Sequence, residues 1–135
     1  MKYSKATNYA LHTMLHLVAS TAENPVGVQQ LAEIQQVSQT YLSKILTKLV
    51  KAGMIESASG AGGGYKLIRR KEDISFLDVI HAIEGTASLF HCGLEHNSEE
   101  CLIQGVMVEA EQTMEQVLRE RKLISLVDKV QVVRK

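Results

Sequence analysis

Apolar and polar positions separate most clearly between Ser38 and Gly53, where the pattern predicts an α-helix. The apolar side chains recur at i, i+3, i+4, i+7 and i+8, which places them on one helical face: Leu42, Ile45, Leu46, Leu49 and Val50. Ser38 stands where an N-cap hydroxyl accepts a backbone N–H, and Gly53 stands where a left-handed residue ends a helix. The opposite face offers amides, hydroxyls and amines but no carboxylate: Gln39, Thr40, Ser43, Lys44, Thr47, Lys48 and Lys51. Such groups can read base edges and neutralise phosphates.

Two further helices are expected before this one. A stripe of apolar side chains predicts a helix over residues 5–20: Ala6, Ala10, Leu11, Met14, Leu15, Leu17 and Val18. Residues 21–27 contain the only proline, Pro25, and are expected to form a loop. A short second helix is predicted around Val28, Leu31 and Ala32, and residues 34–37 turn the chain into the helix after Ser38. A short helix, a tight turn and a longer helix with a basic and polar face are typical of a helix-turn-helix.

A glycine-rich stretch follows the predicted recognition helix. Residues 59–64 (SGAGGG) lie between two expected strands, 54–57 and 65–68, and cannot hold a regular element because glycine loses too much entropy there. The stretch is not a phosphate-binding loop, since it lacks the pattern G-x-x-x-x-G-K-[ST] and a strand rather than a helix follows it. We therefore predict a hairpin wing whose Gly62, Gly63 and Lys66 approach phosphates or a minor groove.

The second half of the chain is expected to contain a helix, a loop and a long helix. Apolar positions predict a helix over residues 73–84: Phe76, Val79, Ile80 and Ile83. Residues 85–102 follow neither a helical nor a strand period. From about Ile103 the apolar positions form a heptad seam: Ile103, Met107, Ala110, Met114, Val117, Arg121 and Ile124. The seam favours a homodimer over a helix packed only on its own domain, and residues 126–133 fit either a short helix or a frayed tail.

These elements predict a mainly α fold with a small β-hairpin. We expect a winged helix-turn-helix domain over residues 1–84, and a cysteine-containing sensor loop with a dimerisation helix over residues 85–135. The formal net charge is zero, but residues 1–71 carry nine Lys/Arg against three Asp/Glu, and residues 72–135 carry six against twelve. The basic part can meet a phosphate backbone, which would repel the acidic part.

Other function classes find little support in the sequence. No catalytic constellation is visible, because G-x-S-x-G does not occur and His12 and His16 lack the intervening glutamate of H-E-x-x-H. We therefore expect no enzyme. The two histidines are expected to lie at the edge of an apolar helix face. No apolar run approaches the roughly 20 residues that cross a bilayer, and no signal-peptide pattern appears. We expect a soluble cytoplasmic protein without a membrane partner.

Two cysteines, Cys92 and Cys101, lie in the loop before the long helix, where thiols or ligands are expected rather than a structural disulfide. Three interpretations stay open. A redox switch needs two thiols that can approach each other, and Gly93 gives the loop freedom. An iron–sulfur cluster needs further ligands from this chain or a second subunit, for which the candidates are His91, His96 and Met107. In the third interpretation the two cysteines are unreactive.

The chain resembles the winged-helix repressors of the Rrf type, the family of IscR, NsrR and CymR. The resemblance covers nearly the whole chain and rests on SKATNYALHTMLHLVA, VSQTYLSKILTKLVKAGMIES and GAGGGYKLIRRKEDISFLDVIHAIEG, followed by the cysteine loop. It implies a dimer joined by the long helix, with residues 38–51 in the major groove and the wing in the minor groove. Pattern and resemblance together identify these DNA-binding residues: Ser38, Gln39, Thr40, Tyr41, Ser43, Lys44, Thr47, Lys48, Gly62, Gly63 and Lys66.

The sequence departs from the cluster-binding members of this family at two positions. Those members carry three cysteines in this loop. In this chain Cys92 and Cys101 match the first two, and Met107 stands at the third position. The nitric-oxide-sensing branch also uses an aspartate in the first helix, and Asn8 stands at that position here. A thioether and an amide are poor iron ligands. We predict a dimeric regulator, a repressor of a pseudo-palindromic operator, that responds to a redox signal at Cys92 and Cys101. The alternatives are a cluster sensor of nitric oxide or iron status, with His91, His96 or Asn8 as extra ligands, and a regulator controlled by a protein or small-molecule effector.

Overall fold

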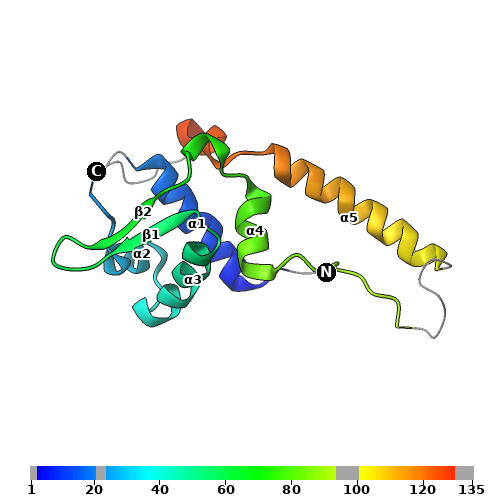
Figure 1. The fold of residues 1–135 in the computed structure, drawn as a ribbon, viewed down its shortest axis with the longest axis horizontal. Coiled ribbons are helices and arrows are strands. Elements are labelled where there is room, and N and C mark those ends of the chain that lie inside the picture. Colours follow the sequence, from blue (N-terminus) through cyan, green and yellow to red (C-terminus); the bar gives the residue numbers. More distant parts are fainter. Residues whose placement is uncertain (1–2, 21–23, 94–100, 130–135) are drawn as a thin grey trace.

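The computed structural model describes residues 3–20, 24–93 and 101–129. A helical body carries a two-stranded hairpin, and one long helix projects from it (Figure 1). The elements in chain order are α1 (Lys5–Ala19), α2 (Val28–Gln35), α3 (Gln39–Lys51), β1 (Ile55–Ala58), β2 (Gly64–Leu67), η1 (Lys71–Asp73), α4 (Phe76–Glu84), α5 (Leu102–Glu120) and η3 (Leu123–Lys129). This arrangement confirms the predicted fold class.

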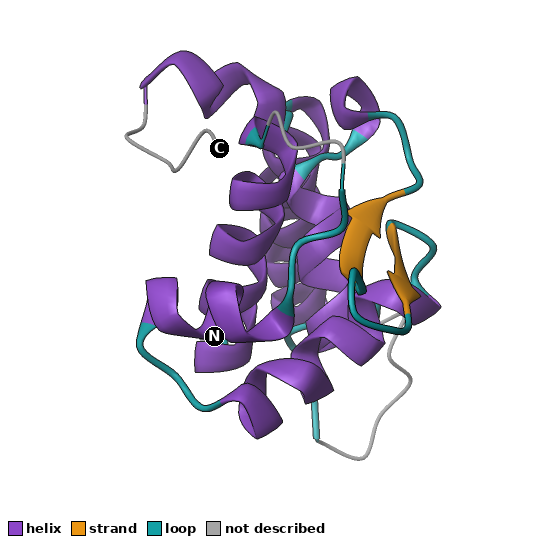
Figure 2. Ribbon diagram, turned by 90° about the vertical axis from the view of Figure 1, so that its left-hand side faces the viewer, coloured by secondary structure: helices purple, strands orange, loops and turns teal. Residues whose placement is uncertain are grey.

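Helix α1 lies at the centre of the hydrophobic core. It packs against α3, α4, β2 and η3, and its Ala10 and Met14 are fully buried. From α3, the core takes three side chains with no exposed surface: Leu42, Leu46 and Leu49. Burying a side chain of this kind contributes about 1.5–3 kcal/mol, so the apolar face of α3 fixes this helix on the body. Figure 2 shows the two strands at one side of the helices.

The turn before α3 has the geometry of a helix-turn-helix. Helix α2 extends to Gln35, so the turn begins later than the predicted range 34–37, and Gln36 adopts the left-handed conformation (φ 56°). The hydroxyl of Ser38 accepts the backbone N–H of Tyr41 at 3.1 Å, which confirms the predicted N-cap. Gly53 has φ 78° and ends the helix in the left-handed conformation, as predicted.

The wing is an antiparallel hairpin whose strands are offset by one residue from the prediction. Strand β1 begins at Ile55 rather than Met54, β2 begins at Gly64 rather than Tyr65, and the register runs from Ile55↔Leu67 to Ala58↔Gly64. Gly64 has φ 146°, and a Cβ there would collide with the carbonyl group of Val26, so the first position of β2 requires glycine. Val26 exchanges two backbone hydrogen bonds with Tyr65, which tie the wing to the segment before α2.

The helix predicted over residues 73–84 is shorter in the structure. Residues 71–73 form the turn η1, Ile74 is extended, and α4 begins only at Phe76. The start is set by a capping box, in which the Ser75 hydroxyl accepts the Asp78 N–H and the Asp78 carboxylate accepts the Ser75 N–H, both at 3.0 Å. These reciprocal bonds satisfy backbone donors that the first turn of a helix leaves without partners.

Helix α5 packs mainly on α4 and projects beyond the body (Figure 1). It ends at Glu120, because Arg121 is extended and its carbonyl oxygen accepts the N–H of Phe76 at 3.0 Å. The predicted heptad seam is therefore wrong in its last two members, Arg121 and Ile124, which lie outside α5. Neither α5 nor any other helix in the described ranges is long and apolar enough to cross a membrane.

The chain returns to the body after α5. Leu123 in η3 is 1% exposed and packs in the core that contains α1. Leu123 belongs to the predicted domain of residues 85–135, yet it completes the core of the predicted domain of residues 1–84. The division into two domains at residue 84 stays a prediction. Residues 85–93 form neither helix nor strand, as expected, whereas residues 94–100 and 130–133 lie outside the described ranges.

Candidate nucleic-acid interface

The outer face of α3 carries the polar side chains that were predicted to contact DNA. Gln39, Thr40, Lys44 and Lys48 are all exposed, and α3 contains no Asp or Glu. The two lysines are four residues apart, so they lie on the same side of the helix. This face can offer an amide and a hydroxyl to base edges near its N-terminus, and two ammonium groups to phosphates farther along.

Several other predicted contact residues already have partners within the protein. The Ser38 hydroxyl caps α3, and the Thr47 hydroxyl donates to the carbonyl oxygen of Ser43 at 2.9 Å. Tyr41 meets Tyr9 of α1 edge-on, with ring centroids 5.8 Å apart. These residues shape the surface of α3, whereas the two lysines and the first-turn side chains remain available to a ligand.

Glu84, at the end of α4, anchors the start of α1. Its carboxylate accepts hydrogen bonds from the Thr7 hydroxyl, from the Ser4 backbone N–H at 2.8 Å and from the Ser4 hydroxyl at 3.0 Å. These hydrogen bonds lower the pKa of Glu84, and the bond from Thr7 has the largest effect. The nearby Lys48 ammonium lowers it further by a small amount. The charged carboxylate of Glu84 therefore accepts hydrogen bonds at the start of α1, where the helix itself supplies no acceptor.

The three predicted contact residues of the wing, Gly62, Gly63 and Lys66, differ in exposure and in their partners within the protein. Lys66 faces Glu56 across the hairpin at 3.5 Å, and both side chains are about half exposed. An exposed pair of this kind contributes about 0–1 kcal/mol, so Lys66 can exchange its partner for a phosphate at little cost. Gly62 is exposed at the tip, whereas Gly63 is half-buried and a Cβ there would collide with the carbonyl oxygen of Ala58. The turn itself therefore requires Gly63.

Arg69 joins three elements close to the end of α3, a role that its position in the sequence does not indicate. Its guanidinium donates to the carbonyl oxygen of Ala52, just after α3, at 3.0 Å, and lies 3.2 Å from the carboxylate of Asp78 in α4. Asp78 also holds the start of α4 through the capping box. One side chain thus connects the exit of the wing with the end of α3 and the beginning of α4.

Replacing Arg69 with alanine is expected to lower the free energy of unfolding by about 1–3 kcal/mol, because a carbonyl and a carboxylate lose a charged partner. Unfolding in urea measures the change. Arg70→Ala is the matched control, because Arg70 is 77% exposed and pairs only at the surface with Glu72 and Asp73. The control should cost less than about 1 kcal/mol. Equal losses in the two variants would contradict the linking role of Arg69.

Helix α5 turns a polar side toward the body and an apolar stripe outward. On the polar side, Glu115 lies 3.3 Å from the His81 ring nitrogen of α4, and Glu111 accepts hydrogen bonds from Ser88 and Leu89. The outward stripe consists of Ile103 (69% exposed), Val106 (64% exposed), Ala110 and Val117 (52% exposed). No residue of α5 is buried. Such a stripe on a projecting helix is a candidate contact surface.

Both cysteines lie at the start of α5, where each contacts Gln104. The side-chain oxygen of Gln104 accepts the backbone N–H of Cys92 at 3.2 Å, and its backbone N–H donates to the sulfur of Cys101 at 3.3 Å. Cys101 is the N-cap of α5, and both cysteines are half-buried thiols. The structure therefore brings the two predicted effector residues to one helix N-terminus.

The remaining candidate ligands lie apart or outside the described ranges. His91 is exposed, and His96 belongs to residues 94–100. Asn8 is exposed on α1, and its carbonyl oxygen is 2.8 Å from the ring nitrogen of His12. His16 is buried in α1, and this burial lowers its pKa, so a buried neutral ring is favoured.

The sequence matches one family model over almost its whole length. That model is described as "Rrf2: Iron-dependent Transcriptional regulator" and covers residues 3–129. The chain belongs to the Rrf2 family. The Rrf2 family is a family of transcriptional regulators.

Named Rrf2 relatives and solved structures support the assignment. The chain is 33% identical to the Rrf2 protein of Nitratidesulfovibrio vulgaris (84% of this chain, 79% of the relative) and 30% identical to NsrR of Shouchella clausii (94% and 89%). Its fold matches CymR of B. subtilis with a TM-score of 0.80 at 24% identity (97% of this chain, 99% of the other). It also matches IscR of T. potens with a TM-score of 0.76 at 28% identity (100% and 94%).

Because the Rrf2 family is described as iron-dependent, we compared the side chains of this protein with those that an iron site needs. Within the described ranges, no three His, Cys, Asp or Glu side chains are close enough to hold a metal ion. The positions where cluster-binding relatives are expected to carry a cysteine and an aspartate hold a half-buried Met107 and an exposed Asn8. A thioether and an amide bind iron weakly. The described residues of one chain therefore do not fit an iron–sulfur cluster.

Proposed function

We propose that this Rrf2-family chain is a dimeric, DNA-binding repressor that places α3 in the major groove and the wing against the minor groove. The observation that carries the proposal is the exposed face of α3, which has three lysines and no carboxylate and lies opposite a buried apolar face. Gln39 and Thr40, in the first turn, are placed to read base edges, which is where recognition helices carry their base contacts. Lys44 and Lys48 then supply phosphate contacts.

The outward stripe of α5 supports a second copy of this chain as the partner. A helix that turns its polar side to its own body leaves apolar surface for a matching helix, and Ile103, Val106, Ala110 and Val117 repeat at heptad spacing. A two-fold dimer would present two α3 helices to one duplex, so its operator should be a pseudo-palindrome.

Selection of duplexes from a random-sequence pool tests this function without any knowledge of the regulated genes. The protein should enrich sites with two inverted half-sites whose centres are separated by about one helical turn, 34–36 Å, or a multiple of it. Enrichment of no sequence, or of a site without two-fold symmetry, would contradict a dimeric repressor.

Gln104 contacts both cysteines at the start of α5. We infer that Cys92 and Cys101 form the redox switch, in which an oxidant such as diamide takes two electrons and two protons from the two thiols and leaves a disulfide. A disulfide would require their Cα atoms to lie within about 7 Å. Because Cys101 caps α5 and Gln104 contacts both residues, this bond would disturb the start of α5. The apolar stripe begins there at Ile103, so the spacing of the two DNA-binding heads would change.

Oxidation is therefore expected to weaken operator binding of the wild type, and Cys92→Ser and Cys101→Ser should each abolish that response. The measurement is operator affinity before and after diamide treatment, with each serine variant under reducing conditions as its own control. Equal losses in all three proteins, or no response in any, would show that these thiols are not the switch. A brown protein with stoichiometric iron and sulfide after anaerobic purification would favour a cluster instead.

A further inference from the structure

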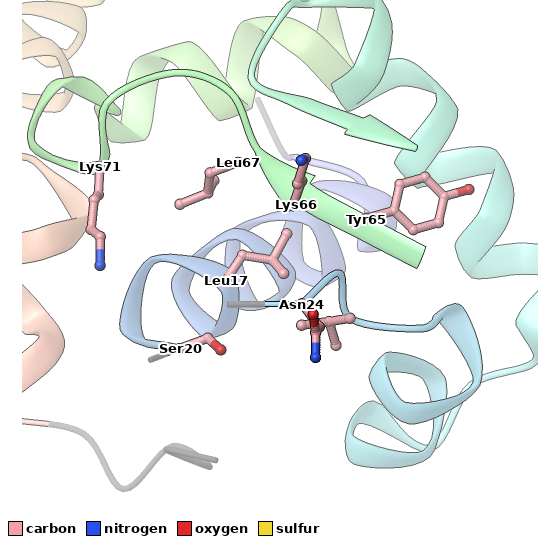
Figure 3. Close-up of a pocket in the computed structure, with 8 residues that line it drawn as sticks. Leu17, Ser20, Asn24, Tyr65, Lys66, Leu67 and Lys71 are labelled. Atoms are coloured by element: carbon pink, nitrogen blue, oxygen red, sulfur yellow. The ribbon is translucent and has the colours of Figure 1, made fainter. Parts of the chain in front are cut away.

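A hollow of about 210 Å³ lies at the base of the wing, away from α3 and α5, and it shares only Lys66 with the residues assigned to DNA. It is bounded by the end of α1, the segment before α2, strand β2 and the turn η1 (Figure 3). Leu17, Val26 and Leu67 give it apolar surface, and Ser20 and Asn24 give it a polar edge. Pockets for drug-sized ligands have volumes of about 300–1,000 Å³, so this smaller hollow suits an organic molecule below drug size.

One ammonium group is available at the hollow. Lys71 lies on its border, and no carboxylate among the described residues is within ion-pair distance of it. Lys66 also lines the hollow, but Figure 3 shows its amine pointing away, and that amine pairs with Glu56 at 3.5 Å. Lys71 is therefore the cation that a ligand here would meet.

The edge of β2 supplies a backbone donor. Tyr65 exchanges hydrogen bonds with Val26 at 2.8 and 2.9 Å, whereas the N–H of Ile68 donates to the carbonyl oxygen of Met54, just before β1 on the opposite side of β2. Alternate residues of an antiparallel strand direct their N–H groups to the same edge, so the N–H of Leu67 lies on the Tyr65 side. The pairing on that side is an isolated bridge at Val26, which leaves the Leu67 donor open toward the hollow.

We propose that this hollow binds a small monocarboxylate with a short apolar chain. The carboxylate accepts hydrogen bonds from the Lys71 ammonium and the Leu67 N–H, and the apolar chain packs on Leu17 and Val26. The bound molecule bridges β2 and the segment before α2, so it restrains the base of the wing. A regulatory consequence rests on the proposed DNA-binding function: occupancy changes operator affinity about fivefold or more, the range of ordinary coupling between two sites.

The probe is 4-methylpentanoate, and 4-methylpentanamide is its uncharged control of the same shape. Amide chemical shifts of the full chain without DNA should change saturably at Leu67 and Asn24 with the acid and stay unchanged with the amide. Lys71→Met should weaken binding of the acid about tenfold or more, and Lys71→Arg should restore it. Lys5→Met is the matched control, because Lys5 is an exposed lysine at the far end of α1.

Equal binding of the acid and the amide, unaltered binding by Lys71→Met, or saturation by inorganic phosphate but not by the acid would overturn the assignment. Operator titrations with and without 4-methylpentanoate then distinguish a failure of the ligand site from a failure of the proposed DNA-binding function. A protein that binds the acid at Leu67 but enriches no DNA has the site and lacks the proposed function. A protein that binds its operator but shows no shift with the acid has the function and lacks the site.

Discussion

Replacing Val106 and Val117 together with aspartate is expected to convert the proposed dimer to a monomer. Both side chains are more than half exposed on the outward stripe of α5, so the substitution should not disturb the fold of one chain. In a dimer, however, it would bury unpaired carboxylates at the helix pair, which is strongly unfavourable. Operator affinity should fall about 10²–10⁴-fold, because two linked half-site contacts become independent ones.

Light scattering at micromolar concentration measures the change in mass. Gln112→Asp is the matched control, because Gln112 is exposed on the side of α5 away from the stripe and the substitution introduces the same charge. The predicted seam contained Met107 and Met114 but not Val106. The two methionines are less suitable, because Met107 is half-buried and the sulfur of Met114 lies 3.9 Å from the Tyr3 hydroxyl. A monomeric wild type, or a dimeric Val106→Asp/Val117→Asp variant, would contradict the assignment of the stripe.

Substitutions on α3 are expected to divide into two classes. Lys44→Ala and Lys48→Ala should weaken binding to all sequences alike, because phosphate contacts carry no sequence information. Gln39→Ala and Thr40→Ala should instead change the preferred base at single positions, each by about 1–3 kcal/mol of discrimination. Selection from a random pool with each variant distinguishes the two classes.

Lys129→Ala is the control for removal of a positive charge, because Lys129 is an exposed lysine in η3, outside the proposed interface. It should bind the selected operator like the wild type. If all four α3 variants also bind with wild-type affinity and preference, α3 is not the recognition helix.

The parts of the fold that follow local rules could be predicted from the sequence. The apolar spacing of α1 and α3, the Ser38 cap and the left-handed Gly53 depend on residues within one or two turns, and the structure has all of them. The start of α4 was predicted too early, although Ser75 and Asp78 have the spacing of a capping box. That motif is a local signal in the sequence, and it marks Ser75 as the N-cap of α4.

The long-range contacts could not be predicted. Thr7 and Glu84 are 77 positions apart, and Arg69 meets Ala52 only because the wing returns beside the end of α3. The heptad pattern likewise continued past Glu120, because nothing local shows that Arg121 bonds to Phe76 and ends α5. The candidate DNA residues of α3 could be proposed from the sequence because their signal is a helix face, whereas the hollow at the wing arises only when the end of α1, the segment before α2, β2 and η1 meet.

The salt dependence of operator binding tests the central claim, that α3 is the phosphate-contacting surface, most directly. For the selected operator, the logarithm of the association constant should fall linearly with the logarithm of salt concentration between about 50 and 200 mM. Lys44→Ala/Lys48→Ala should reduce that slope by about two units, one for each phosphate that no longer has a lysine partner, and Lys129→Ala should not change it. A wild-type slope near zero, or a double variant with the wild-type slope, would contradict the account.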